Sequence, residues 1–439
     1  ASGSAGTGEN TAIGYLAGTA NTTAIRNTLV GAYAGNNLTT SGGNTLLGTR
    51  AGTTLTTGAG NIAIGYGAMY QSTTSNTNVV IGSDAMYSGN KAALYNVVIG
   101  PSAGMRMANF AAGRNVYVGM NAGHNATGSY NTFLGYDAGK GGTTSAPYSS
   151  GQNNTAVGYT ALAAFTTGDN NIAIGNRALL VQTTGGNNVV IGEGAMRDTD
   201  AGSNSLNSNY NVFIGTATGG GTWTDAESNY NTFVGGASAG SPLEGAVYNS
   251  GLGYRVAESL TSGDGNVIAG GIAGANITAG HRNVVIGYNS ATTLTTGDYN
   301  IYIGSDANAS GADVNDEIVL AAGTDSLAGG GTETIRIGVD SDYIVNDFGE
   351  NASWAHSSDI RIKKDIEDNE LGLDFISKLK TRNFKKKAPS EYPSEFEQHN
   401  EDTTERKNPD RKHYGFVAQE VKEAMDDVGH SQFPVWKEQ

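Results

Sequence analysis

Apolar residues recur along roughly the first 300 residues in short, evenly spaced groups of three. Each group follows an asparagine and is closed by a glycine, as in "NTLVG" at Asn27 and "NVVIG" at Asn78. A β-branched run of this length, ended by glycine, is typical of a very short strand followed by a turn with positive φ or close backbone approach. The glycine density excludes helices. We therefore expect many three-residue strands.

These groups form a sequence repeat, whose positions we count from the asparagine (position 0). The repeat has 17 copies, and nine of the 16 spacings between them are 17 residues. Position +4 is glycine in every copy, and position +7 is alanine in 13. The copies begin at Asn10, Asn27, Asn44, Asn61, Asn78, Asn96, Asn115, Asn131, Asn154, Asn171, Asn188, Asn211, Asn231, Asn249, Asn266, Asn283 and Asn300.

A single unit of this kind has too few apolar side chains to bury a core alone, so the units are expected to stack. Stacking at the spacing of paired strands, about 4.8 Å, gives a rod on the order of 80 Å long with the asparagine amides in a hydrogen-bonded ladder. A threonine-rich or valine-rich face repeated in register favours side-by-side association of several rods. Longer spacings, at Asn131 to Asn154 and Asn188 to Asn211, predict loops suited to recognition.

The repeat resembles the β-roll heads of trimeric autotransporter adhesins and, more closely, the glycine-rich repeats of phage tail fibres, over residues 8–310. The resemblance implies a homotrimer of elongated β-solenoids. We therefore predict a mostly β fold, a β-solenoid of about 17 coils in residues 1–310. Residues 311–352 alternate apolar and polar positions, which predicts a connector of a few longer strands.

The composition changes sharply after residue 350. The last 89 residues hold 15 basic and 18 acidic residues but only three of the 65 glycines. Here "SSDIRIKKDI" is followed by "LGLDFISKLKTRNFKKK", which predicts a helix running into a strand at residues 382–385. "HYGFVAQEVKEAM" then predicts a strand passing into a helix with Ala418, Val421 and Met425 on one face. We expect a small α+β domain at residues 353–439.

These three motifs, in this order, resemble the C-terminal intramolecular chaperone domain of phage endosialidases, tail fibres and neck appendages. The resemblance implies a chaperone that drives trimerisation and then cuts itself off between Ser357 and Ser358. By position, Ser358 matches the nucleophile, Lys363 its partner, and Asp359 has a positioning role. A lysine can activate a serine if burial lowers its pKa. The chain stops at "FPVWKEQ", so we expect a C-terminally truncated chaperone.

Charge and composition exclude several classes of partner. A formal net charge of −15 disfavours binding to nucleic acid, and the absence of cysteine excludes disulfides and thiolate metal sites. No stretch approaches 18 continuous apolar residues, so no membrane insertion is expected. We expect no cofactor and no metal.

Three features of the rod have alternative interpretations. A glycan depolymerase needs two facing carboxylates, but Asp84 and Asp306 share one repeat position, so turn-forming aspartates are favoured. The spacer aspartates Asp169, Asp264 and Asp298 are interpreted in the same way. Paired threonines could bind a crystalline surface, but threonine is also a good strand and turn residue. Tyrosines after the repeat glycine suit sugar stacking if they face outward and packing if inward: Tyr15, Tyr66, Tyr136, Tyr159, Tyr254 and Tyr288.

We therefore predict a fibrous, homotrimeric receptor-binding protein, on a virion as a tail fibre or on an extracellular surface. Its partners would be copies of itself and a host cell-surface glycan or protein receptor, and its peptidase would act only on its own chain. The alternatives are a tailspike that depolymerises a surface glycan and a bacterial trimeric adhesin.

Overall fold

The computed structural model describes residues 9–88, 93–107, 113–145, 148–198, 207–223, 226–340, 342–348, 351–355, 372–385, 387–393 and 412–429. The chain divides into two compact units, residues 1–356 and 357–439. Each unit is described by itself below.

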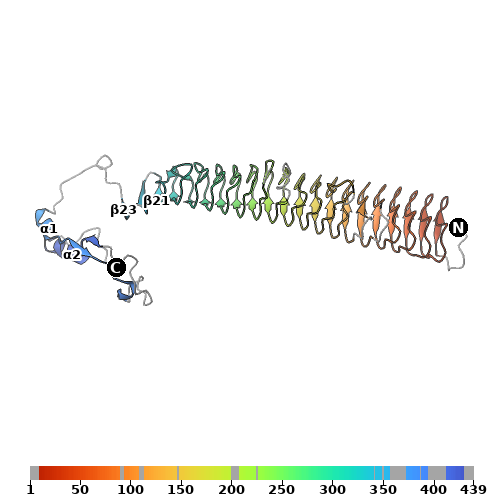
Figure 1. Cartoon of the computed structure of the whole chain (residues 1–439), viewed down its shortest axis with the longest axis horizontal. Helices are drawn as coiled ribbons and strands as arrows, with labels where there is room; N and C mark the ends of the chain where they lie inside the picture. Colours follow the sequence, from red (N-terminus) through yellow and green to blue (C-terminus); the bar gives the residue numbers. More distant parts are fainter. Residues whose placement is uncertain are drawn as a thin grey trace. The chain divides into compact units, whose positions relative to one another are not determined.

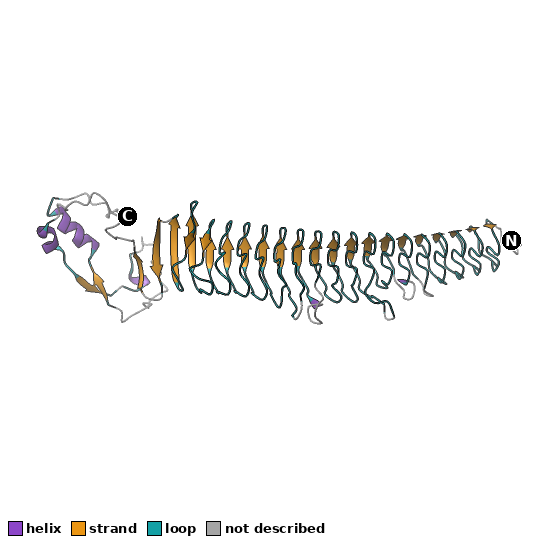
Figure 2. Cartoon of the chain, turned by 90° about the horizontal axis from the view of Figure 1, so that it is seen from above, coloured by secondary structure: helices purple, strands orange, loops and turns teal. Residues whose placement is uncertain are grey.

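The first unit is built on one long parallel sheet with one strand from each coil (Figures 1 and 2). Strands run in register with the next coil, as where Ile172, Ala173 and Ile174 pair with Val189, Val190 and Ile191. The repeat strands are β1 Thr11–Ile13, β2 Thr28–Val30, β3 Thr45–Leu47, β4 Ile62–Ile64, β5 Val79–Ile81, β6 Val97–Ile99, β7 Val116–Val118, β8 Thr132–Leu134, β9 Thr155–Val157, β10 Ile172–Ile174, β11 Val189–Ile191, β12 Val212–Ile214, β13 Thr232–Val234, β14 Ser250–Leu252, β15 Val267–Ala269, β16 Val284–Ile286 and β17 Ile301–Ile303. The predicted β-solenoid is confirmed.

The repeat glycine at position +4 ends each strand for a steric reason. Gly158 has φ of +133°, and a Cβ added there would stand 2.4 Å from the carbonyl oxygen of Gly175 in the next coil. Side chains therefore cannot occupy this position without moving the backbone, both because of φ and because the coils approach so closely. This explains why every copy of the repeat has glycine here.

The core is a narrow column inside the coils, in which two repeat positions share the volume. In most coils with a large residue at position +2, position +8 is glycine: a Cβ at Gly139 would lie 2.5 Å from the ring of Phe133. In three of the four coils with alanine at position +2, position +8 is large, as with Ala173 and Leu179, both fully buried. Leu179 adopts φ of +50° to fill that space. A large residue at one of the two positions goes with a small residue at the other, so the interior of each coil stays filled.

The asparagines at position 0 form the predicted ladder along the inside of the coils. The backbone N–H of Asn171 donates to Oδ1 of Asn154 at 2.9 Å, and its Nδ2 donates to the carbonyl of Gly185, also at 2.9 Å. Its own Oδ1 accepts both the backbone N–H and the Nδ2 of Asn188, each at 3.1 Å. The buried amides are thus paired from one coil to the next.

Beyond residue 310, two longer strands extend the parallel sheet: β19 Ile318–Ala322 and β21 Thr334–Val339. Strands β22 Asp342–Asp347 and β23 Asn351–Ala355 then add antiparallel, and β18 Ala307–Asn308 pairs with β20 Leu327–Ala328.

In the coil after Asn300, Glu317 takes the place of the repeat asparagine and is fully buried. Its carboxylate accepts the hydroxyl of Tyr302 at 2.8 Å and the N–H of Gly331 at 2.8 Å. The asparagine column therefore ends on a carboxylate that binds the next turn.

The second unit contains the short elements that the sequence predicted. Helix α1 Leu373–Lys378 leads to β24 Arg382–Phe384, and β25 His413–Gly415 leads to helix α2 Ala418–Asp426, with a 3-10 turn η4 at Pro389–Glu391. Strands β24 and β25 pair antiparallel. The guanidinium of Arg382 donates to both carboxylate oxygens of Glu420, at 2.9 and 2.5 Å. This bond lowers the pKa of Glu420 and joins β24 to α2.

Candidate functional site

The predicted self-cleavage site lies outside the described residues. Ser357, Ser358, Asp359 and Lys363 all fall in residues 356–371, of which the structure describes no contact. The pairing of serine with lysine therefore stays a prediction.

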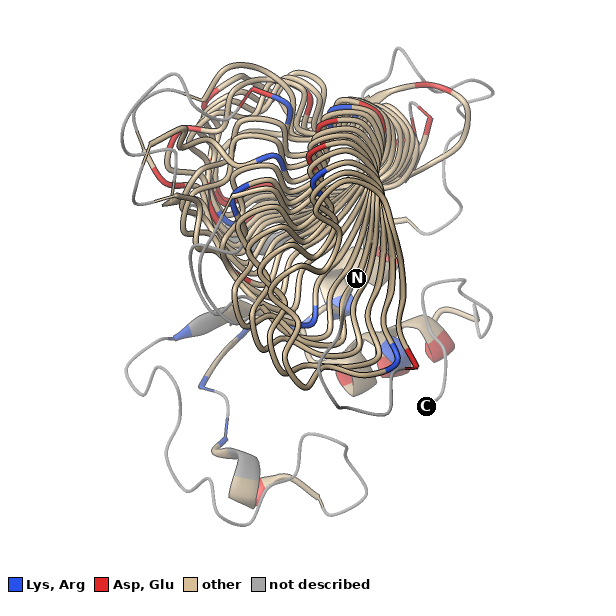
Figure 3. Cartoon of the chain, turned by 90° about the vertical axis from the view of Figure 1, so that its right-hand side faces the viewer, with Lys and Arg blue, Asp and Glu red and all other residues tan. Residues whose placement is uncertain are grey.

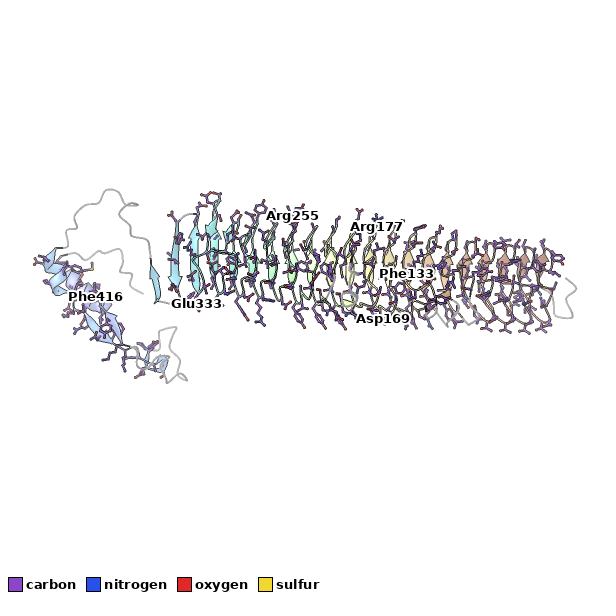
Figure 4. All side chains as sticks on the ribbon, turned by 45° about the horizontal axis from the view of Figure 1, so that its top comes forward. Phe133, Asp169, Arg177, Arg255, Glu333 and Phe416 are labelled. Carbon is purple, nitrogen blue, oxygen red and sulfur yellow. The ribbon has the colours of Figure 1, made fainter. Side chains whose placement is uncertain are left out.

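The described part of the second unit leaves its apolar side chains exposed. Leu373 and Ile376 of α1 are 81% and 59% exposed, and no residue of α1 is buried. Tyr414 is 77% exposed, and Phe416, labelled in Figure 4, is 51% exposed. Such surfaces mark sites of association in soluble proteins. Among the described residues, this unit has few buried side chains of its own: Ala388, Ala424 and Met425.

The outward face of the long sheet is uncharged and largely apolar, with Val or Ile at position +1 in ten repeats and Thr or Ser in seven. Positions +1 and +3 point away from the core, and neither position carries a charged residue in any of the 17 repeats. Position +3 is aliphatic throughout, and Ile13, Leu47 and Leu252 are 40–60% exposed. Seen end-on, the charged residues gather at the turns of the coils, and long stretches between the turns carry none (Figure 3). We call these two columns the sheet face.

The tyrosines that follow the repeat glycine face outward, which settles the alternative that the sequence left open. All six are exposed: Tyr15, Tyr66, Tyr136, Tyr159, Tyr254 and Tyr288. The rings of Tyr136 and Tyr159 stack at 5.4 Å between centroids. These residues form a broken aromatic column beside the C-terminal ends of the strands.

A second aromatic column, which sequence reasoning missed, lies at position −1. Tyr210, Tyr230 and Tyr248 stack with centroids 5.1 Å apart, and all three are exposed. Arg114 lies over the rings of Tyr95 and Tyr130 in the same column, at 5.7 and 5.5 Å. The sequence does carry a signal for this column, because a tyrosine recurs directly before the repeat asparagine. Tyrosines therefore flank the sheet face on both sides.

The paired threonines serve the coil rather than a flat binding array. The hydroxyl of Thr56 donates to the carbonyl of Thr73 in the next coil at 3.0 Å, and Thr295 donates to the carbonyl of Ala312 in the same way. Because the first threonine of several pairs binds the backbone of the next coil, the structure favours the turn interpretation.

The spacer aspartates are also structural. Oδ1 of Asp169 accepts the backbone N–H of Gln152 at 2.6 Å, and Asp264 and Asp298 accept Val247 and His281 in the same manner. Figure 4 shows Asp169 on the long edge opposite Arg177 and Arg255. These carboxylates lie in a column that caps backbone groups, as expected for turn residues.

Two absences hold for the described residues. No group of three or more His, Asp or Glu side chains there is arranged to hold a metal ion. In the same ranges, no helix has the length and apolar character needed to cross a membrane.

Comparison with known proteins gives one match. Residues 358–430 match the family described as the chaperone of endosialidase. This segment contains the serine and lysine singled out above and all of α1, β24, β25 and α2. No curated protein sequence matches the chain. The β-solenoid followed by this C-terminal match fits a tail-fibre or endosialidase-type protein with a C-terminal chaperone.

Proposed function

Because its C-terminal residues match the chaperone of endosialidase, we propose that this protein is a homotrimeric adhesive fibre of the phage tail-fibre type. The β-solenoid of residues 1–310 and the connector of residues 311–352 bind a host cell-surface receptor. The domain of residues 353–439 guides assembly of the three chains. The fibre acts on a virion or another extracellular particle.

One observation supports the trimer most directly: the sheet face is uncharged, largely apolar and in register along the whole solenoid. Seventeen coils at about 4.8 Å give a face roughly 80 Å long. A strip about 10 Å wide would bury on the order of 800 Å² per partner, the size of a standard stable interface. A second copy carries the same columns at the same spacing, so parallel copies match coil by coil.

The exposed apolar residues of α1 and β25 support the role of the second unit. Leu373, Ile376 and Tyr414 would be buried only by another surface, and chain association supplies one. A chaperone that acts between chains needs exposed apolar side chains, because side chains buried in its own core could not contact the other chains.

Oligomeric mass and cell binding test this function together. Light scattering on the purified full chain, kept whole by Ser358→Ala, is expected to give three times the mass of one chain. The same material, labelled, is expected to bind intact host cells saturably. A monomeric mass would overturn the trimer, and trimers that bind no cell would overturn the adhesive role.

Self-cleavage is the enzymatic part of the proposal. Ser358 attacks the carbonyl of Ser357, the peptide nitrogen leaves, and water then hydrolyses the ester, with Lys363 taking and returning the proton. Asp359 positions the pair. On expression, mass spectrometry is expected to find a fragment beginning at Ser358, and Ser358→Ala should abolish it. Asn383→Ala, on β24, is the control. Fragment persisting in Ser358→Ala would exclude Ser358 as the nucleophile.

A further inference from the structure

A trough lies on the turns that follow strands β11 to β14. Its volume is about 530 Å³, within the roughly 300–1,000 Å³ typical of ligand sites. It belongs to neither the sheet face nor the predicted cleavage site. Figure 4 shows Arg255, which lies at the end of the trough nearer the C-terminus, on a long edge of the solenoid.

The trough exists because two successive coils have glycine or alanine where the coils on either side have larger residues. Position +9 is glycine in two successive coils, Gly220 and Gly240, while position +6 is alanine in both, Ala217 and Ala237. The coils on either side carry charged residues at position +9, Arg197 and Glu258. The trough therefore has a floor of backbone and small side chains and a charged wall at each end.

At each end of the trough an ion pair fixes the orientation of the lining residues: Arg197 and Asp198 both line it, and Glu258 lines it while its partner Arg255 lies just outside. Arg197 and Asp198 lie 2.9 Å apart between Nη2 and Oδ2, and Arg255 and Glu258 lie 2.6 Å apart between Nη2 and Oε2. All four side chains keep between a third and a half of their surface exposed. A guanidinium beside a carboxylate offers hydrogen-bond donors and acceptors together, which suits a hydroxyl group that both donates and accepts.

An exposed aromatic ring adjoins the second wall. Tyr254 directly precedes Arg255 and is 61% exposed. Its ring extends toward Gly236 of the preceding coil, where a Cβ would lie 3.7 Å from Cδ2 of the tyrosine. Since glycine has no side chain to cover the ring, an apolar face of a ligand can stack there.

We propose that this trough binds a segment of a neutral, linear glycan lying along the solenoid axis, an inference that rests on the adhesive function proposed above. The walls stand three coil spacings apart, about 14 Å, which accommodates about three sugar residues. The trough is lined by three carboxylates, Glu193, Asp198 and Glu258, and by one arginine, Arg197, so acidic glycans are repelled. Asp198 and Glu258 are each bound to an arginine and stand farther apart than the roughly 5–9.5 Å between glycosidase carboxylates, so the glycan is held intact.

The test uses the full chain and a panel of trisaccharides, neutral glucose and galactose trimers in several linkages and matched uronic acid trimers. Calorimetric titration is expected to show at least one neutral trimer binding and no acidic one. Thr216→Trp, at an exposed position in the trough, should weaken that binding at least tenfold. Its control is Thr49→Trp, at the same repeat position outside the trough. Arg255→Ala should weaken binding at least fivefold, whereas Arg177→Ala should not.

The trough proposal is overturned if no neutral trimer binds, if Thr216→Trp binds as well as Thr49→Trp, or if an acidic trimer binds better. Its failure is distinguishable from failure of the adhesive function. Saturable binding to host cells that is retained in Thr216→Trp would leave the fibre an adhesin with its receptor site elsewhere. Loss of cell binding in Thr216→Trp, with Thr49→Trp unaffected, would support both.

Discussion

The asparagine at position 0 shows how one residue type can hold a coil in place. Asn171 donates two hydrogen bonds and accepts two, all inside a fully buried column. Leucine or alanine at this position would leave several buried backbone and amide groups without partners. A buried polar group left without a hydrogen bond costs more free energy than a typical hydrogen bond contributes to stability.

Asn171→Ala is therefore expected to destabilise the solenoid by about 2–4 kcal/mol, because it leaves the Gly185 carbonyl and the Asn188 N–H unpaired. Urea denaturation followed by circular dichroism would measure this. The control is Asn176→Ala, an exposed asparagine of the same coil. Equal midpoints for the two variants would contradict a stabilising role for the ladder.

A half-buried histidine makes stability depend on pH. Burial lowers the pKa of His124, which outweighs the opposing effect of its hydrogen bond with Asn125, and the nearby Arg106 and Lys140 lower it further. The folded pKa therefore lies below the unfolded value of about 6.5, so the neutral form is favoured in the folded chain. The contribution is complete above the unfolded pKa and is lost as pH falls.

Between pH 7 and pH 5, the wild-type chain should lose stability that His124→Gln retains. Melting temperatures at both pH values would show this as a smaller drop in the variant. The exposed-edge variant His281→Gln supplies a comparison at a second histidine. An identical pH dependence for wild type and His124→Gln would contradict the assignment.

At the scale of the coil, the sequence predicted the strand, the glycine turn and the stacking, because these follow from a strict repeat. It did not reveal the partnership of positions +2 and +8, since that depends on which residues the turn brings face to face. The two positions meet at Phe133 and Gly139, where a Cβ on the glycine would lie 2.5 Å from the ring, and Ala173 and Leu179 are fully buried at the same two positions. Chain distance alone gives no hint of this contact.

Ala173→Phe alone should overpack the coil and cost about 1–3 kcal/mol, and Leu179→Gly alone should leave a cavity and cost about 2–4 kcal/mol. The double variant reproduces the arrangement of Phe133 with Gly139 and should recover most of the loss. A double-mutant cycle in urea would measure the coupling. Additive losses would mean that the two positions do not share volume.

At the scale of the whole molecule, the sheet face and the second unit have the same character: both present apolar side chains that the single chain does not cover. The sequence predicted association of rods and the order of the C-terminal elements. It could not decide between outward and inward tyrosines, because a repeat of 17 residues fixes the spacing of a column but not its direction. Ser358 and Lys363, outside the described residues, rest on the family match alone.

Two lysines on the sheet face should separate the chains. Leu47→Lys with Ile64→Lys places charges on successive coils of the proposed interface, where burial of an unpaired ammonium is costly. Light scattering should show more monomer than in wild type. The control, Thr57→Lys with Thr74→Lys, adds the same charge to exposed spacer positions of the same two coils. Unchanged mass in the first variant would exclude this face from the trimer.

Uniform pairing from coil to coil also governs how the protein can change its length. Where Asn154, Asn171 and Asn188 are 17 residues apart, removing one whole block leaves the next asparagine under the same partner. Recombination between neighbouring copies would therefore shorten or lengthen the reach of the fibre by one step at a time, without rotating its surfaces. The same asparagine pairing spans spacings of 16 and of 23 residues, so a deletion confined to a long loop would leave the coils beyond it in register.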